Sequence, residues 1–564
     1  MNSERGTTLL ALLVCLVSAG AAEAQTPERL RALAHSYYAW RDSTNPVGSS
    51  DAGGHQWDDR LADYRMSQVQ ARRLHTRTLL ERVKAMPTAG WSKDDQVDWR
   101  LFRAQLERDD FFGRTLFPHE SDPQLYLNEA ANGVFSLLKK DYATRRVRAL
   151  SAAARLEKVP ALLRTARSNL TRPVKLFARL VIAAARGGDD LYTTSLMTLA
   201  DSLSPSERTR LDTARDHAVK AIHEFADWLE QRLSTMPDWK PMGVAQYNHL
   251  LKNILLLPYD ATQIAMLGEV ELARYRGLEA MLKEPSFASP DPARAAHVPK
   301  DQEEFLKAYE SRLDELVKFL KANRLITIPD YLGPFSIRQL PEAFKPTSPG
   351  GFMNPPGLYD KDPSGFFFIP TYNSKSGNFY IRAAIEDPRP ILGHEGIPGH
   401  FLQISIANQL DNEIRRQHND NTFIEGWALY GEEMLLRAGG GLYPENSPSH
   451  GQVLRLSRYR AARIGVDVNL QTGRWSFEQA VKYFMEAGGL DREAAEGEAA
   501  GAAASPSQKI GYMVGKWQIM RLLGRYRDQQ GDKFRLGEFH DRLLSFGSLP
   551  LSVIETLMLE EGGR

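Results

Sequence analysis

The 564-residue sequence has a single cysteine, Cys15, and this cysteine lies in an N-terminal segment with the features of an export signal. Arg5 supplies a positive charge, residues 9–17 form an apolar run, and Ala-Glu-Ala at residues 22–24 matches a cleavage site. We therefore predict that residues 1–24 are a signal peptide and that the mature chain is periplasmic or secreted. The residues before Cys15 are not the small ones that a lipoprotein signal requires, so we expect no lipid anchor there.

Several functional classes find no support in the sequence. A mature chain without cysteine excludes disulfides, cysteine nucleophiles and cysteine-ligated metal. The formal net charge is only +1, from 71 basic and 70 acidic residues, so neither nucleic acid nor an anionic membrane surface is expected as a partner. No later run is long and apolar enough to cross a membrane, so we expect no integral membrane segment after signal cleavage. Glycine-rich phosphate loops and the Gly-x-Ser-x-Gly elbow of serine hydrolases do not stand out either.

The pattern of apolar residues predicts a mainly helical protein. Residues 25–325 read as successive helices, and Ser-Pro-Ser-Glu at 204–207 has the sequence of a capped helix start. Residues 261–283 and 303–320 carry apolar side chains at helical spacing. We divide the mature chain into this N-terminal region and a region that holds the site, residues 326–564, and we expect the two to pack as one body.

Proline, glycine and aromatic residues become frequent between residues 326 and 382. Residues 366–369 and 378–381 are rich in aromatic and branched side chains, which predicts two short strands of a small sheet beside the site. Helical spacing returns after His400. We expect one interruption at residues 493–505, where alanine, glycine and glutamate predominate and predict a loop.

The strongest chemical signal is the segment His-Glu-Gly-Ile-Pro-Gly-His at residues 394–400. Zinc hydrolases use neutral imidazoles and a carboxylate as ligands, together with a base that deprotonates water. The usual helical motif separates its histidines by four residues, whereas here the spacing is six, so a regular helix would point His394 and His400 to different faces. Pro398 and Gly399 are the additional residues, and a bulged turn at these two would bring the histidines together.

A second carboxylate-bearing helix is predicted at residues 425–433. Glu425 and Glu432 fall on one face of this helix, together with Ala428 and Leu429. The flanking positions are apolar, so these carboxylates are expected to be buried, and buried carboxylates need a partner or a metal.

These two segments, 394–403 and 423–430, resemble the DUF885 family of bacterial proteins, which is regarded as related to zincin metallopeptidases. Weaker similarity to the same family extends over residues 460–467, 475–480 and 506–515. The resemblance implies a mainly α, zincin-like metallohydrolase with a small sheet beside the helices of the site.

The resemblance also implies a set of functional residues. It assigns zinc binding to His394, His400 and Glu425, and the role of general base to Glu395. The sequence departs from the family pattern in three places. Members of the family often have a histidine at the positions of Phe401 and Gln471. Residues 498–502 do not preserve the E-x-x-R-Y element of the family.

Four further residues could act on a bound substrate or near it. Tyr512 is a candidate donor to the developing oxyanion, although a tyrosine in the core is an equally good interpretation. Arg460 and Arg463 could grip a substrate carboxylate. Asp467 is expected to support the metal ligands from outside the cluster. Because Asp467 follows Arg463 by four residues, an ordinary salt bridge within one helix is the favoured role for Arg463.

Three remaining candidates come from segments next to the ligands. Glu432 is expected to accept a hydrogen bond from a ligand histidine, or else to be solvated. Asn378 and Tyr380 could line the substrate edge of the predicted strand, although strand aromatics more often belong to the core.

The sequence therefore predicts an exported zinc hydrolase, most simply a peptidase that acts on short peptides. Two alternatives stay open. The same site would serve a hydrolase of non-peptide amides, and the departures at Phe401 and Gln471 would suit a non-catalytic binding protein with a degenerate site.

Overall fold

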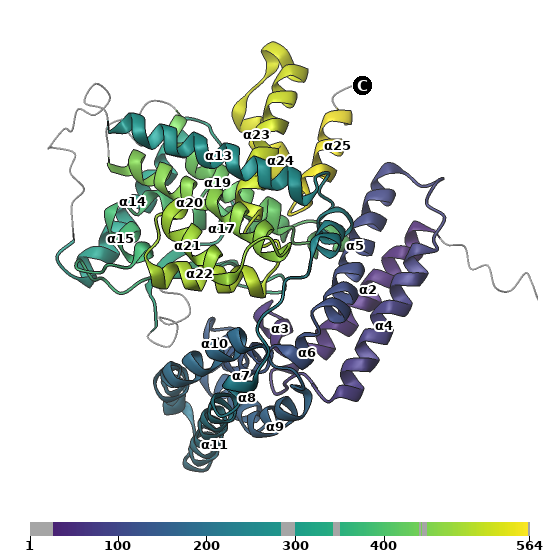
Figure 1. The fold of residues 1–564 in the computed structure, drawn as a ribbon, viewed down its shortest axis with the longest axis vertical. Helices are drawn as coiled ribbons and strands as arrows, with labels where there is room; N and C mark the ends of the chain where they lie inside the picture. The colour runs from purple at the N-terminus through teal and green to yellow at the C-terminus, as the bar shows by residue number, and fades with distance from the viewer. Residues whose placement is uncertain (1–25, 284–298, 342–349, 439–441, 443–447, 562–564) are drawn as a thin grey trace, which may run out of the picture.

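The computed structural model describes residues 26–283, 299–341, 350–438, 442 and 448–561, so the predicted signal peptide lies outside the described residues. Helices account for 70% of the chain and strands for 3%, which confirms the mainly helical class with one small sheet (Figure 1). No helix in the part of the chain that the structure describes is long and apolar enough to cross a membrane.

The N-terminal half is helical, as predicted. Ser204 caps its helix together with Glu207, in the reciprocal arrangement that the sequence indicates. The α-helices of this half are α2 (Pro27–Thr44), α3 (Pro46–Asp51), α4 (Met66–Lys84), α5 (Lys93–Thr115), α6 (Pro118–Ser121), α7 (Gln124–Leu138), α8 (Arg145–Leu156), α9 (Val159–Asn169), α10 (Lys175–Gly187), α11 (Pro205–Glu230), α12 (Val244–His249), α13 (Ala261–Leu282) and α14 (Gln302–Ala322). Short 3-10 or π segments are η1 (His55–Trp57), η2 (Leu191–Ser195), η3 (Leu196–Ser202), η4 (Leu233–Thr235) and η5 (Leu250–Ile254).

The second half contains the remaining helices. They are α15 (Phe379–Glu386), α16 (Arg389–Glu395), α17 (His400–Ala407), α18 (Glu413–Arg416), α19 (Asn421–Arg437), α20 (Pro448–Gln471), α21 (Phe477–Tyr483), η8 (Phe484–Gly488), α22 (Arg492–Ala504), α23 (Gly511–Gln530), η9 (Gly531–Lys533), α24 (Leu536–Leu544) and α25 (Leu551–Glu561). In Figure 1, α7–α11 form a bundle at the bottom, α2, α4 and α5 lie at the right, and the later helices lie above.

Three large apolar cores hold these helices together. One lies within the bundle of α7–α11. A second joins α2, α4 and α5 to α16, α17, α19 and the C-terminal helices. A third joins α13 to α20, α22 and α23. Because the second and third cores take side chains from both sides of residue 325, the N-terminal helices and the site share buried surface.

The small sheet has three strands in the order β1-β3-β2. Its strands are β1 (Phe335–Gln339), β2 (Phe352–Asn354) and β3 (Gly365–Ile369), with β1 parallel and β2 antiparallel to β3. The predicted strand at 366–369 is confirmed as β3. The strand predicted at 378–381 is wrong, because the Asn378 side chain accepts hydrogen bonds from the backbone of Tyr380 and Ile381 and starts helix α15.

The loop predicted at 493–505 is also wrong, since this segment forms most of α22. Alanine has the highest helix propensity, and Asp491 caps the first turn by accepting from the backbone of Ala494. The frequent small residues therefore serve close packing of a helix against the third core rather than a turn.

Candidate metal centre

The two histidines of the 394–400 segment stand at the facing ends of two helices. His394 is the penultimate residue of α16 and His400 the first of α17. The expected bulge is thus a complete break between two helices. A side chain on Gly399 would overlap the carbonyl oxygen of His394, and Trp427 fixes the turn by donating to the Pro398 carbonyl at 2.7 Å. The break brings the imidazole centroids to 4.7 Å, with the rings nearly perpendicular at 80°.

Glu425 on α19 completes a cluster of three candidate ligands. Its Oε2 lies 3.4 Å from Nε2 of His400 and 3.7 Å from Nε2 of His394. One nitrogen or oxygen atom from each of the three residues lies within 4.8 Å of the other two. The structure therefore brings together the three residues that the sequence predicts as ligands.

The chemistry of this cluster fits a zinc ion. Among the described residues, Glu425 Oε2 is buried and has no hydrogen-bond partner, although two ring nitrogens face it. Burial opposes its ionisation, but His394 and His400 hold the pKa of Glu425 well below its usual range. Two imidazoles and a carboxylate are the donor set of many catalytic zinc sites, in which a fourth position stays open.

Glu432 lies behind His394, on the same helix as Glu425. Its Oε1 is 2.8 Å from Nδ1 of His394 and 3.4 Å from Nη2 of Arg460, and the carboxylate is fully buried. Burial would lower the pKa of His394, but contacts with Glu425 and Glu432 raise it to about 9. A carboxylate at Nδ1 fixes the ring with Nε2 toward the cluster, which is the position predicted for Glu432.

Glu395 and Tyr512 are the two candidates for chemistry beside the ligands. Glu395 ends α16 and is partly exposed. The Tyr512 ring, on α23, is nearly parallel to the His394 ring, with centroids 6.2 Å apart. Burial, and then the charge of Glu425, raise the pKa of Tyr512 well above its usual value, so its hydroxyl stays protonated near neutral pH and can donate a hydrogen bond.

Arg463 and Asp467 do not form the predicted helix salt bridge. Arg463 instead makes two hydrogen bonds to Glu498 of α22, at 2.8 and 2.9 Å. Asp467 accepts from the Tyr247 hydroxyl and from the backbone of the segment that precedes α23. The prediction fails because spacing within one helix says nothing about a carboxylate that a different helix supplies.

Tyr380 and Asn378 are also placed away from a strand edge. The Tyr380 hydroxyl donates to Glu498 at 2.8 Å and lies 2.9 Å from the Tyr459 hydroxyl, whereas Asn378 caps α15. Glu498 is thus a buried hub that sequence reasoning missed. The sequence pattern that could have revealed Glu498 is its helical spacing from Ala494, Ala495 and Ala502, which lie on the buried face of α22.

The two departures from the family pattern have packing roles. Phe401 is fully buried and stacks on Phe335 of β1, with ring centroids 4.8 Å apart. The Gln471 side chain donates to the carbonyl of Ala502 at 2.7 Å and so joins α20 to α22. Neither residue is one of the three clustered ligands.

Arg460 is buried, and Glu432 is its nearest carboxylate. Its Nε and Nη1 have no hydrogen-bond partner among the described residues, and its guanidinium carbon lies 5.9 Å from the centre of the Tyr512 ring. Arg460 is therefore linked to the ligand His394 through Glu432, which contacts both.

Known proteins that are similar to this chain support its fold, but their descriptions name no activity. A family described as "Bacterial protein of unknown function (DUF885)" matches residues 46–558. One similar solved structure comes from Shewanella oneidensis, with a TM-score of 0.72 and 22% identity over 93% of this chain and 99% of that one. Another comes from Colwellia psychrerythraea, with a TM-score of 0.78 and 20% identity over 95% of this chain and 99% of that one. Curated proteins give no match.

The first of these structures is described as a "putative lipoprotein of unknown function" and the second as a "putative lipoprotein". The expectation that this chain has no lipid anchor at Cys15 therefore gains no support from them. Because their sequence identity to this chain is only 22% and 20%, the two structures support the fold alone.

Proposed function

The chain belongs to the DUF885 family of bacterial proteins of unknown function, and we propose that it is an exported, zincin-like, zinc-dependent hydrolase that cleaves short peptides. The observation that carries this proposal is the convergence of His394, His400 and Glu425, with a candidate ligand atom of each within 4.8 Å of the others. Glu432 supports it further, because a carboxylate on the far nitrogen of a ligand histidine is a recurring feature of zinc sites.

A bound zinc ion would polarise a substrate carbonyl and acidify the attacking water. His394, His400 and Glu425 would hold the ion, and Glu432 would keep the His394 ring in place. Glu395, adjacent in sequence and partly exposed, is the group available to accept the proton of the water and pass it to the leaving amine. The Tyr512 hydroxyl would donate a hydrogen bond to the carbonyl oxygen as negative charge develops there.

The burial of the ligands favours a small or extended substrate. The exposed fractions are only 2% for His394 and 7% for His400. Side chains enclosed in this way would be reached more easily by a short or extended peptide than by the backbone of a folded protein. A non-peptide amide of similar size would meet the same groups, so a panel of both substrate types is needed to separate the two activities.

The test combines metal analysis with a substrate screen. The purified mature protein should hold one zinc ion, lose it on substitution His400→Ala, and hydrolyse members of a peptide library in a chelator-sensitive manner. Glu395→Gln should keep the zinc and lose hydrolysis by a factor of at least ~100, because the proton acceptor is removed. Glu478→Gln, a change at an exposed carboxylate on α21, is the matched control and should act like wild type.

Full activity of the metal-bound Glu395→Gln variant would refute the assigned base. Stoichiometric zinc without hydrolysis of any peptide or amide would instead favour a non-catalytic binding protein. A wild-type protein that binds no zinc would refute the metal centre itself.

A further inference from the structure

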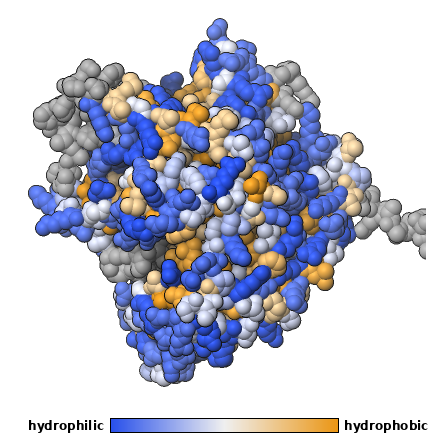
Figure 2. Space-filling model, in the orientation of Figure 1, coloured by the Kyte–Doolittle hydropathy of each residue, from blue (hydrophilic) through white to orange (hydrophobic). Residues whose placement is uncertain are grey.

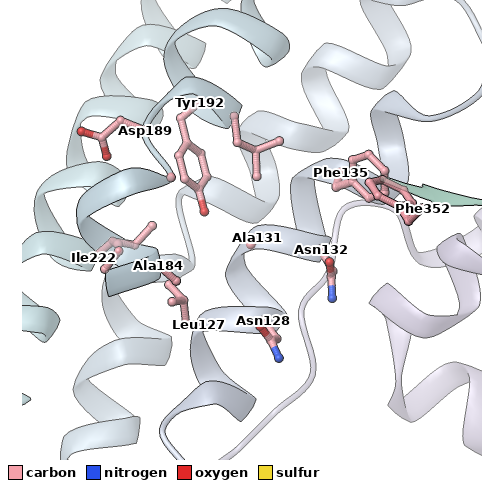
Figure 3. Close-up of a pocket in the computed structure, with 13 residues that line it drawn as sticks. Leu127, Asn128, Ala131, Asn132, Phe135, Ala184, Asp189, Tyr192, Ile222 and Phe352 are labelled. Carbon is pink, nitrogen blue, oxygen red and sulfur yellow. The ribbon is translucent and has the colours of Figure 1, made fainter. Parts of the chain in front are cut away.

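A half-open groove of about 320 Å³ lies in the N-terminal bundle, and none of the candidate metal ligands lines it. Its walls come from α7, the end of α10 with η2, α11 and strand β2 (Figure 3). Cavities of this size are typical of sites for small molecules.

Much of the lining of the groove is apolar. Leu127, Ala131 and Ile222 line the groove, and Leu127 and Ile222 are buried. The rings of Phe135 and Phe352 close one end in an edge-to-face arrangement, with centroids 5.9 Å apart. A third ring placed against this pair would gain the same kind of aromatic contact.

The groove also contains a buried polar group without a partner. Tyr192 is only 3% exposed, and among the described residues its hydroxyl has no hydrogen-bond partner. Figure 3 shows this hydroxyl directed toward the turn of α7 that carries Ala131. A buried hydroxyl without a partner is unfavourable, and a ligand with a complementary polar group would relieve that cost.

The rim offers neutral hydrogen-bonding groups. Asn128 and Asn132 lie one helical turn apart on the exposed side of α7, so their amides present donors and acceptors next to each other. Asp189 is the charged residue of the lining, and its carboxylate pairs with Nε2 of His223 at 2.8 Å. This negative charge disfavours an anionic ligand.

We propose that this groove binds a small neutral amide with an aromatic ring, such as a capped aromatic amino acid or the aromatic residue of a peptide. The ring packs on Phe135 and Phe352 at the apolar end. The amide groups exchange hydrogen bonds with Tyr192 and with the two asparagines of the rim.

The test is a ligand-detected NMR titration of the full mature chain with N-acetyl-phenylalaninamide. The expected dissociation constant is on the order of 1 mM, the range for a ligand of this size with ordinary efficiency. Tyr192→Phe should weaken binding roughly 3- to 10-fold, because one hydrogen bond is lost. The same variant should be as stable as wild type or more stable, since it removes a buried group without a partner.

Tyr126→Phe is the matched control on α7. The Tyr126 hydroxyl donates to the His119 carbonyl and accepts from Asn169, and Tyr126 does not line the groove. This variant should therefore lose stability and keep its affinity for the probe. Ala131→Trp should fill the groove and abolish binding.

Four results would overturn the proposal. They are the absence of saturable binding to wild type, unchanged affinity in Tyr192→Phe, binding that survives Ala131→Trp, and equal affinity for the anion N-acetyl-phenylalanine. None of them bears on the zinc site, which the groove does not contain.

Discussion

Substituting Glu432 by glutamine tests whether the carboxylate behind His394 governs metal binding. The change keeps the size of the side chain and removes its charge. It weakens a 2.8 Å contact between Oε1 and Nδ1 of His394 that lies in a fully buried setting. Substitution of a carboxylate that supports a ligand histidine typically lowers metal affinity by about 10- to 100-fold. We therefore expect zinc affinity to fall by one to two orders of magnitude.

The assay is a competition titration of zinc against a chromophoric chelator. The control is the same substitution at the next residue, Glu433→Gln. Glu433 is also a buried carboxylate paired with cations, since it contacts Lys516 and lies 3.0 Å from Arg274. It makes no contact with His394. Glu433→Gln should lower the free energy of unfolding by about 3–5 kcal/mol, as expected when one partner of a buried ion pair is removed. It should leave the zinc affinity within about twofold of wild type.

Two outcomes would refute this reasoning. If Glu432→Gln binds zinc as tightly as wild type, the contact with His394 does not position a ligand. If Glu433→Gln weakens zinc binding as much as Glu432→Gln, the effect comes from general destabilisation of α19 and not from the carboxylate behind the ring.

Three further predictions concern the turn, a buried acid and the proposed oxyanion donor. Gly399→Ala should lower the free energy of unfolding by about 2–4 kcal/mol in chemical denaturation, because its side chain would overlap the His394 carbonyl, whereas Gly497→Ala, with open space around it in α22, should not destabilise the protein. Asp420→Asn should be more stable than wild type above pH 7 in thermal unfolding, and this difference should shrink as the pH falls toward 4. Burial raises the pKa of Asp420 to about 7 in the folded protein, so its contribution to stability is present below its unfolded value of 3.8 and is lost as the pH rises through 7. Tyr512→Phe should lower kcat by about 100-fold with little change in KM, provided that hydrolysis of a peptide is established.

Each of these three predictions has a clear contrary result. Equal stability of the Gly399→Ala and Gly497→Ala variants would show that the turn tolerates a side chain. A difference between wild type and Asp420→Asn that does not vary with pH would show that this carboxyl does not titrate on unfolding. A Tyr512→Phe variant with normal kcat would leave this tyrosine a packing role beside His394.

The three clustered residues could be predicted from the sequence because each carries a local signal. His394 and His400 flank a proline and a glycine that end a helix, and Glu425 stands on a helix with apolar flanks. Glu432 followed from the same helical spacing, seven residues after Glu425. The form of the break could not be predicted, since residues 396–399 owe their course partly to Trp427, which comes from a distant helix.

The errors share a physical origin, which is competition between local composition and contacts across the fold. The aromatic run at 378–381 suits a strand, but the cap supplied by Asn378 and the helices around it favour a helix. Glycine and alanine at 493–505 suggest a loop, yet small side chains let α22 approach α20 closely. The partner of Arg463, Glu498, lies in that misassigned segment, and the spacing of Arg463 and Asp467 within one helix gave no sign of it.

The charges of α19 explain why so many ionised groups can be buried around one site. Three carboxylates of this helix point to three different sets of cations or ring nitrogens. Glu425 faces the two histidines, Glu432 lies between His394 and Arg460, and Glu433 contacts Lys516 of α23. Gly426 of α19 lies directly against α23, where a side chain would overlap the backbone, so the two helices approach closely enough for Lys516 to reach Glu433. Glu432 and Glu433 each lie next to a cation, Arg460 and Lys516 respectively, whereas Glu425 has only the two imidazoles beside its Oε2. A buried carboxylate of this kind, facing two imidazoles, is the arrangement that a divalent cation stabilises.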